Sequence, residues 1–186
     1  MAATATSRPS CGRRRPRLVR CSRPTGASGA AVRTPSHGLE SFGKAQQRKD
    51  MTAIAVAHGI PYAAQAAGCD WHDLSVKAER AAAAAGPAFL NVLTDCPVGW
   101  GHEPKLSTEI LNAAVESRFW PLYEVVEGRY RLTYEPKKLA PIEEWLRPQK
   151  RFAHLLRPEN RELLEHVRQR VAEDWAALVA RAGLRV

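Results

Sequence analysis

The residue of this chain best suited to chemistry is Cys96, which lies in the run 95–100 (Asp-Cys-Pro-Val-Gly-Trp), just after an apolar segment, residues 88–93. That segment is continuously apolar apart from Asn91, as is typical of a strand buried in a parallel sheet. Cys96 would then lie at the carboxyl edge of the sheet, where open α/β folds bind ligands and cofactors. A thiolate presented there could ligate a metal. From the residues alone, however, a buried structural cysteine is the favoured interpretation, because the loop contains no second thiol.

The nearest second metal ligand is His102, in the same predicted loop as Cys96. One cysteine and one histidine without a second pair do not match the spacing of zinc sites, so a zinc half-site is disfavoured. Cys69 precedes a predicted helix and has no ligand beside it, so it is interpreted as incidental. The remaining histidines of the body are scattered at positions 58, 72, 154 and 166.

Other catalytic and binding motifs are absent from the sequence. It has no Gly-x-Gly-x-x-Gly, no Walker lysine motif and no Ser/His/Asp pattern of recognisable spacing. The aromatic residues at 120, 123, 130 and 134 predict packing of a hairpin and not a base-stacking surface, because only Arg129 and Arg131 accompany them.

The elements before Cys96 predict a βαβ unit. A short helix 51–58 capped by Asp50 is followed by an extended segment 62–66, a helix 71–85 and the strand 88–93. The apolar positions of the helix 71–85 are expected to face the core and its charged positions the solvent. The first set is Trp71, Leu74 and Ala78, and the second is Lys77, Glu79 and Arg80.

After the Cys96 loop the pattern predicts mostly helices. A helix 107–118 with Ser107 as its cap precedes a hairpin, 122–126 and 130–134, and the chain ends in a long helix, 158–182. A short helix is expected at 141–146. The segment 147–156 is expected to be a linker that carries the final helix across the surface or onto a partner.

The positive charge of the chain is concentrated at its start. Residues 1–39 contain eight arginines and no acidic residue, so they carry +8 of the net charge of +9. Residues 1–48 are therefore expected to form a disordered basic leader, a transit peptide being the alternative. Because the remaining body is nearly neutral, a nucleic-acid-binding domain is disfavoured. No apolar run approaches the ~20 residues of a membrane helix, and the four unpaired cysteines favour a reducing compartment, the cytoplasm.

A series of motifs covers most of the chain after residue 43. They occupy residues 43–46, 48–62, 86–89, 96–97, 99–100, 114–116, 120–125, 131–137 and 151–155. With these motifs the chain resembles the C-terminal part of the β subunit of pyruvate:ferredoxin oxidoreductase and related 2-oxoacid:ferredoxin oxidoreductases. These are thiamine diphosphate enzymes that decarboxylate a 2-oxoacid, pass electrons through iron–sulfur clusters to ferredoxin and form acyl-CoA. In that family the cysteine of the Cys-Pro-x-Gly-Trp motif ligates a [4Fe–4S] cluster, so the resemblance implies that Cys96 is an iron ligand.

Two parts of the family pattern are missing from this chain. It lacks the Gly-Asp-Gly motif for diphosphate and Mg²⁺, and it lacks the Cys-x-x-Cys with a third cysteine that supplies the other cluster ligands. Thr25 and Gly26, after Pro24, are at most a remnant of the family's Asn-Thr-Gly run. We therefore expect a truncated β subunit, or a piece of a split or fused gene, that is inactive and free of a cluster by itself.

The expected fold is α/β, a partial thiamine diphosphate-binding domain over residues 49–186. It should contain a short parallel sheet flanked by helices, a β-hairpin and a long C-terminal helix. The expected function is that of a fragment of a pyruvate:ferredoxin oxidoreductase β subunit, and the alternative is a catalytically inert remnant that docks on the α subunit. Thiamine diphosphate, Mg²⁺ and a [4Fe–4S] cluster are expected only in the complete complex. Its partners would be the α and other subunits, ferredoxin, a 2-oxoacid and CoA, without nucleic acid or membrane.

Overall fold

The computed structural model describes residues 49–183, so the leader predicted over residues 1–48 lies outside the described residues. In chain order the elements are α2 (Met51–Ala57), β1 (Tyr62–Ala67), α3 (Trp71–Ala83), β2 (Ala88–Leu93), α4 (Pro97–Trp100), the 3-10 helix η4 (Pro104–Leu106), α5 (Ser107–Glu116), β3 (Tyr123–Val126), β4 (Arg129–Leu132), α6 (Ile142–Leu146), the 3-10 helices η5 (Lys150–Leu156) and η6 (Pro158–Asn160), and α7 (Arg161–Arg181). None of the helices in residues 49–183 has the length and apolar character needed to cross a bilayer.

The strands form one mixed sheet in the order β2-β1-β3-β4. β1 and β2 run parallel, with Tyr62 opposite Ala88 and Ala67 opposite Leu93, and α3 connects them. β3 pairs with the other side of β1 in the antiparallel direction, and β4 pairs with β3. The predicted βαβ unit and hairpin are therefore both present, and the hairpin extends the same sheet. The prediction of an α/β fold with a long C-terminal helix is confirmed.

β2 lies at an edge of the described sheet, and Leu93 is its only buried residue. The prediction that this apolar segment is buried on both faces is therefore wrong. The strand buried along its whole length is β1, whose sequence Tyr-Ala-Ala-Gln-Ala-Ala is dominated by alanine. Short side chains allow helices to approach a strand closely from both faces. An apolar run indicates a strand, but its position in the sheet depends on the strands that pair with it.

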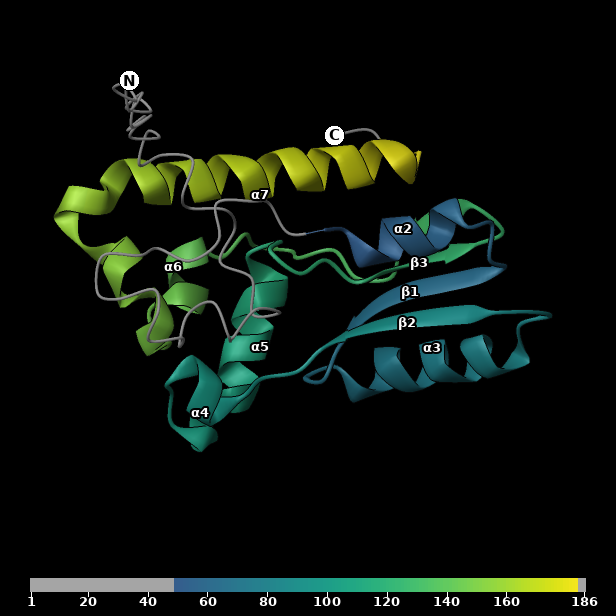
Figure 1. Ribbon diagram of the computed structural model, residues 1–186, viewed down its shortest axis with the longest axis horizontal. Coiled ribbons are helices and arrows are strands. Elements are labelled where there is room, and N and C mark those ends of the chain that lie inside the picture. Colours follow the sequence, from purple (N-terminus) through teal and green to yellow (C-terminus); the bar gives the residue numbers. More distant parts are fainter. Residues whose placement is uncertain (1–48, 184–186) are drawn as a thin grey trace, which may run out of the picture.

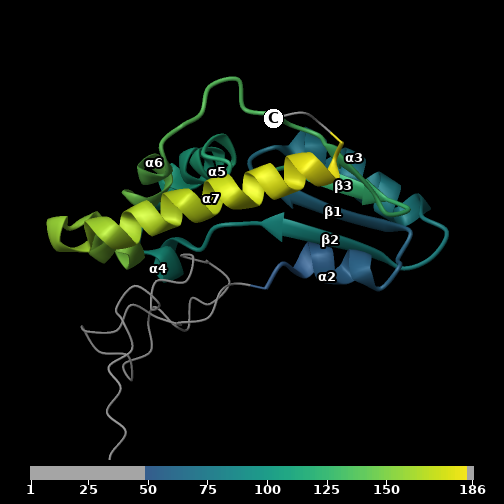
Figure 2. The same ribbon diagram turned by 90° about the horizontal axis from the view of Figure 1, so that it is seen from above.

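Helices cover both faces of the sheet, with α2 and α3 on opposite sides of the β1–β2 pair (Figure 1). Figure 2 shows α7 running along the length of the molecule, from α6 and α4 at one end to the hairpin at the other. The second half of α7 packs on the sheet through Leu178, which joins a small core with Ala63, Tyr123 and Val125. The long helix thus ties the sheet to the helical end of the molecule.

The larger core lies beyond the carboxyl ends of β1 and β2, among α4, α5, α6, η5 and the first half of α7. Trp145 of α6 is fully buried there. Its ring stacks on Phe119 with the centroids 3.9 Å apart, and Trp100 and Phe152 approach it at 6.5 and 5.3 Å. This aromatic cluster joins four segments that are distant in the sequence, so it determines how the helical end is assembled.

The segment 147–156 is not a surface linker, as the sequence analysis expected. Its second part forms η5, and Phe152 and Leu155 are buried in the larger core. The side chain of Arg151 is buried with them. The prediction fails because apolar residues three apart in so short a segment give no clear period, whereas the aromatic cluster provides a place for each of them.

α3 is turned relative to the predicted orientation. Trp71 is 74% exposed, whereas Lys77 is fully buried. The Lys77 Nζ atom donates hydrogen bonds to the backbone oxygen of Gln65 at 2.8 Å, to Asp73 Oδ2 at 2.5 Å and to Thr133 Oγ1 at 2.8 Å. Burial lowers the pKa of Lys77, and the Asp73 carboxylate opposes that shift. The three acceptors offset the cost of burying an ammonium group, which helical periodicity cannot predict.

A buried carboxylate joins the sheet to α3. Glu124 of β3 is 1% exposed, accepts a hydrogen bond from the Tyr62 hydroxyl and pairs with Arg80 and Arg131. Burial alone would raise the pKa of Glu124, but the hydrogen bonds from Arg80, Arg131 and Tyr62 outweigh it and lower the pKa below its ordinary value. The ionised form of Glu124 is therefore part of the native structure.

Local signals for helix starts and turns are largely confirmed. Asp50 and Asp70 cap α2 and α3 by accepting hydrogen bonds from backbone amides three residues ahead, at 3.0 and 2.9 Å. Glu127 and Gly128 both have positive φ, as a two-residue type I′ hairpin turn requires. Ser107 does not cap α5, because it is the first helical residue and its hydroxyl donates to the backbone oxygen of Pro104.

Replacing Trp145 tests the aromatic cluster. Trp145→Ala should lower the free energy of unfolding by about 3–5 kcal/mol, because it leaves a cavity against Phe119, Trp100 and Phe152. The matched control is Trp71→Ala, which removes the same side chain from an exposed position and should change stability by less than about 0.5 kcal/mol. Urea unfolding of the full chain measures both. Equal effects of the two substitutions would contradict the described core.

Glu124 predicts a loss of stability in acid. Because its pKa is lower in the folded than in the unfolded chain, its contribution is complete above the unfolded value of about 4.3 and is lost as pH falls through the folded value. Glu124→Gln should therefore destabilise the protein by about 1–3 kcal/mol at pH 7 and by less as the pH drops below about 4. The control is Glu127→Gln, at an exposed position of the same hairpin, which should retain the wild-type pH dependence. Urea midpoints measured between these pH values decide the matter.

Candidate functional site

Cys96 lies three residues beyond β2, on the side of the sheet where β1 and β2 both end. It is exposed and serves as the N-cap of α4, with Sγ accepting a hydrogen bond from the backbone nitrogen of Gly99 at 3.3 Å. Pro97 occupies the first turn of α4, and Gly101 ends it in the left-handed region with φ of 72°. The interpretation of Cys96 as a buried structural cysteine is therefore wrong. Its placement at the carboxyl edge of the β1–β2 pair is as the sequence predicts.

An open groove of about 370 Å³ runs beside Cys96. Its walls come from the start of α2, the second half of β2, the Cys96 loop and the aromatic residues after α5. Lys49, Met51, Asp95 and Trp100 are among the residues that line it. Met51 is 47% exposed although it is a large apolar residue. The thiol therefore faces a hollow that is partly apolar and accessible from outside.

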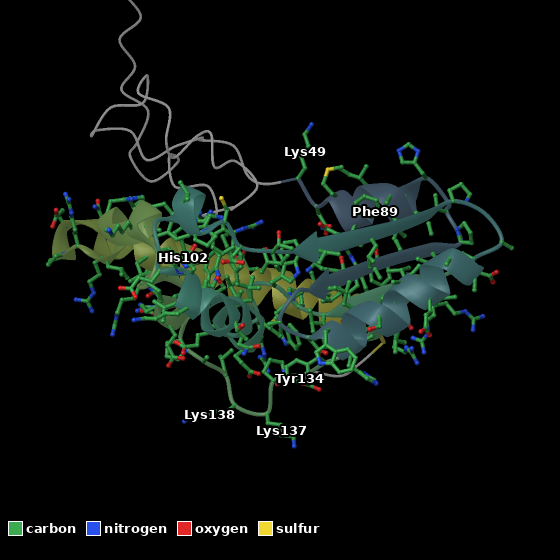
Figure 3. The ribbon with its side chains drawn as sticks, turned by 90° about the horizontal axis from the view of Figure 1, so that it is seen from below. Lys49, Phe89, His102, Tyr134, Lys137 and Lys138 are labelled. Atoms are coloured by element: carbon green, nitrogen blue, oxygen red, sulfur yellow. The ribbon has the colours of Figure 1, made fainter. Side chains whose placement is uncertain are left out.

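His102 does not complete a metal site with Cys96. Its side chain is fully buried, Nδ1 lies 2.9 Å from the backbone oxygen of Glu103, and Nε2 lies 3.3 Å from Asp95 Oδ2 without the alignment of a hydrogen bond. Nδ1 is therefore engaged by the loop backbone, and Nε2 faces the Asp95 carboxylate rather than Cys96. In Figure 3, His102 lies inside the body, whereas Lys49 projects outward at the start of the described chain.

η5 forms the wall behind the Cys96 loop. The backbone nitrogen of Lys150 donates to the oxygen of Gly101 at 3.3 Å, and a β-carbon added to Gly101 would lie 2.9 Å from Lys150 Cβ. The guanidinium of Arg151 lies 3.9 Å from the centroid of the Trp100 ring. The Cys96 loop thus packs against a segment that lies about fifty residues further along the chain.

Apart from Trp120, which lines the groove, the other described residues singled out from the sequence do not gather at this site. Cys69 is half-buried against the larger core, and burial raises the pKa of its thiol. Trp120 is buried and donates from Nε1 to the backbone oxygen of Ala66, and Tyr123 stacks on Tyr130. These aromatic residues pack the fold, as predicted. Lys137 and Lys138 lie at the tip of the loop between β4 and α6, on the side of the body opposite Lys49 (Figure 3).

The donors in residues 49–183 fit one ligand of an iron–sulfur cluster and not a whole cluster. A [4Fe–4S] cluster takes four thiolates, whereas the described cysteines are Cys69 and Cys96, of which only Cys96 is exposed. The described residues contain no group of three or more metal-binding side chains. What fits is a single accessible thiol on a braced loop. A complete cluster at Cys96 requires ligands from outside this part of the chain.

Arg151 is the site residue that sequence reasoning missed. The sequence contained one sign that this segment is buried, the three-residue spacing of Phe152 and Leu155. Both side chains are buried in η5, and so is Gln149 just before it. That signal indicates a buried segment but not which loop it contacts.

No model of a protein family matches the chain. Similar curated proteins include two pyruvate synthase subunits PorB. That of Methanothermobacter marburgensis is 40% identical over 75% of this chain and 48% of its own length, and that of Thermotoga maritima is 37% identical over 81% and 47%. A ketoisovalerate oxidoreductase subunit VorB from Pyrococcus furiosus is 35% identical over 81% of this chain and 48% of its own. The chain thus spans about half the length of the curated relatives it matches, and the resemblance stated from the motifs is confirmed.

Substitutions at glycines test how the loop is braced. Gly101→Ala combines a positive φ with a close approach to Lys150 and should cost about 2–4 kcal/mol. Gly128→Ala has a similar φ of 80° but meets nothing within 4 Å, so it should cost about 1 kcal/mol. Urea unfolding of the two variants separates the close contact from the backbone strain. If both cost the same, the loop is not held against η5.

Proposed function

We propose that this chain, a homologue of the β subunits of pyruvate synthase and ketoisovalerate oxidoreductase, contributes a cluster-ligating loop to a 2-oxoacid:ferredoxin oxidoreductase complex. The observation that carries the proposal is the exposed thiol of Cys96, on a braced loop at the carboxyl edge of the sheet. Residues 49–186 are, in this proposal, the C-terminal part of a thiamine diphosphate-binding domain.

Cys96 supplies one thiolate to a [4Fe–4S] cluster, and the remaining ligands come from another polypeptide or from chain outside residues 49–183. The cluster, when bound, accepts and passes on single electrons. Thiamine diphosphate and Mg²⁺ are held elsewhere in the complex, because this sequence has no motif for them. The role of this chain's own residues is to hold the Cys96 sulfur at a fixed place through Gly99, Gly101 and η5.

The reaction of the complete complex converts a 2-oxoacid, CoA and two oxidised ferredoxins into an acyl-CoA, carbon dioxide, two reduced ferredoxins and a proton. Pyruvate is the proposed substrate, on the similarity of residues 120–125 and 131–137 to the family's pyruvate enzymes. The proposed partners are the α and other subunits and ferredoxin, in the cytoplasm, where thiols stay reduced.

The open groove supports a second polypeptide beside Cys96. Met51 and Ile54 of α2 are exposed next to β2, which is an edge strand of the described sheet. An edge strand flanked by apolar residues favours pairing with a further chain. The same surface supports the second candidate function, a catalytically inert subunit that docks on the α subunit and binds no iron. The two candidates differ only in whether Cys96 ligates metal.

Removing the Cys96 sulfur tests the proposal. The full chain is purified anaerobically with its companion subunits, and iron content, the electron paramagnetic resonance spectrum and pyruvate-dependent dye reduction are measured. Cys96→Ser should lose at least about half of the signal of one [4Fe–4S] cluster and most of the activity, because serine is a poor iron ligand. The matched control is Cys69→Ser, which removes a thiol packed against the core and should retain both.

Two results would contradict the proposal. One is a complex in which Cys96→Ser retains wild-type iron content, spectrum and activity. The other is a complex of wild-type chain and α subunit that contains no iron and reduces no dye, which would establish the inert subunit instead.

A further inference from the structure

Arg151 carries a buried positive charge that no carboxylate of the described residues balances. The residue is 7% exposed, and none of the ion pairs within residues 49–183 includes it. Its Nε and Nη2 atoms donate to the side-chain oxygen of Gln149, whereas Nη1 is buried with no hydrogen-bond partner among the described residues. Removing an ion from water without a counter-charge costs folding free energy, so some other group must compensate the charge of Arg151.

Aromatic rings provide part of the compensation. The Arg151 guanidinium lies 3.9 Å from the ring centroid of Trp100 and 4.4 Å from that of Phe152. Cation–π attraction stabilises a guanidinium that is removed from water. That does not replace the hydration of a whole cation, and burial lowers the pKa of Arg151 to about 9. The compensation within the described residues is therefore incomplete.

Arg151 packs against the loop that contains Cys96. Trp100, on which it stacks, belongs to α4, and the Trp100 backbone nitrogen donates to the oxygen of Cys96 at 2.7 Å. The backbone nitrogen of the neighbouring Lys150 donates to the backbone oxygen of Gly101. Burial lowers the pKa of Arg151, and the nearby Cys96 sulfur opposes that shift. The other charges beside the loop do not serve this role, because Asp95 faces His102 and Lys150 is exposed to solvent.

We propose that Arg151 is a positioning residue that stabilises negative charge on the Cys96 sulfur and on the metal bound to it. The proposal rests on the proposed function for the identity of that metal, but not for the charge at the sulfur itself. Its physical basis is the geometry: a buried, incompletely paired guanidinium stacked on the loop whose cysteine is exposed. A positive charge close to an iron–sulfur cluster stabilises its reduced, more negative form and so raises its reduction potential.

The first test measures the local charge in the full chain without metal. Cys96 is alkylated by anionic iodoacetate and by neutral iodoacetamide at one pH, and peptide mass spectrometry follows each cysteine separately. The ratio of the two rate constants cancels the fraction of thiolate and reports the local charge. Arg151→Met, which retains an unbranched side chain without the charge, should lower the iodoacetate-to-iodoacetamide ratio at Cys96 about two- to fivefold.

Control variants separate charge from structure. Arg151→Lys keeps the charge and should keep most of the wild-type ratio. Lys150→Met removes a charge one residue away but exposed to solvent, and should change the ratio by less than about 1.5-fold because water and salt screen it. If Arg151→Met does not fold, Arg151→Gln replaces it, because glutamine also lacks the charge but keeps a hydrogen-bond donor for Gln149, and it should lower the ratio by a similar factor. An unchanged ratio in a folded variant without the Arg151 charge overturns the proposal.

The second test uses the complete complex and distinguishes this proposal from the proposed function. Arg151→Met should retain the cluster with a lower midpoint potential, and Arg151→Lys should restore the potential towards the wild-type value. A loaded cluster whose potential is the same in wild type and Arg151→Met overturns the role of Arg151 while Cys96 remains a ligand. A complex that keeps its cluster in Cys96→Ser, together with a lowered alkylation ratio in Arg151→Met, overturns the proposed function and leaves the charge at Cys96 intact.

Discussion

The packing of Trp145 against three other aromatic rings is the interaction on which the rest of this structure depends. Phe119 follows α5, Trp100 ends α4 and Phe152 lies in η5, so the cluster gathers segments that have no core of their own. α4 is only four residues long and cannot be stable as an isolated helix. The position of the Cys96 loop therefore follows from where the Trp100 ring is held. A site on such a loop is as rigid as the core behind it.

Among the described residues, two of the three buried charges show how this fold compensates such groups. Lys77 has three oxygen acceptors, and Glu124 has two arginines and a tyrosine hydroxyl. Lys77 lies in α3 and Glu124 in β3, whereas Arg151 lies in η5 at the helical end of the molecule. Arg151 has one amide oxygen and aromatic faces. Lys77 and Glu124 have protein partners that balance their charges, whereas the pairing of Arg151 is incomplete. The group that would complete it is therefore sought in the adjacent Cys96 loop.

The arrangement around Cys96 is that of one side of a site. The thiol is exposed, the groove beside it is open, and the adjoining strand is an edge of the described sheet. The curated relatives are about twice as long as the matched region. In the proposed complex, the second polypeptide would cover the groove and bring the missing thiolates to the sulfur that this chain holds in place. In that complex, residues 49–183 would orient the Cys96 sulfur as one ligand and set the charge around it.

By itself, the sequence determined the features that depend on a few adjacent residues. Asp50 and Asp70 cap helices because a short acceptor reaches amides three residues ahead, and Glu127-Gly128 forms a hairpin turn because the following strands need its twist. The order of elements and the placement of the Cys96 loop after β2 followed from the same local rules. Tertiary structure alone decided which face each element buries. β2 became an edge strand, Trp71 an exposed residue, and Lys77 and Arg151 buried cations, because burial depends on partners that periodicity does not contain.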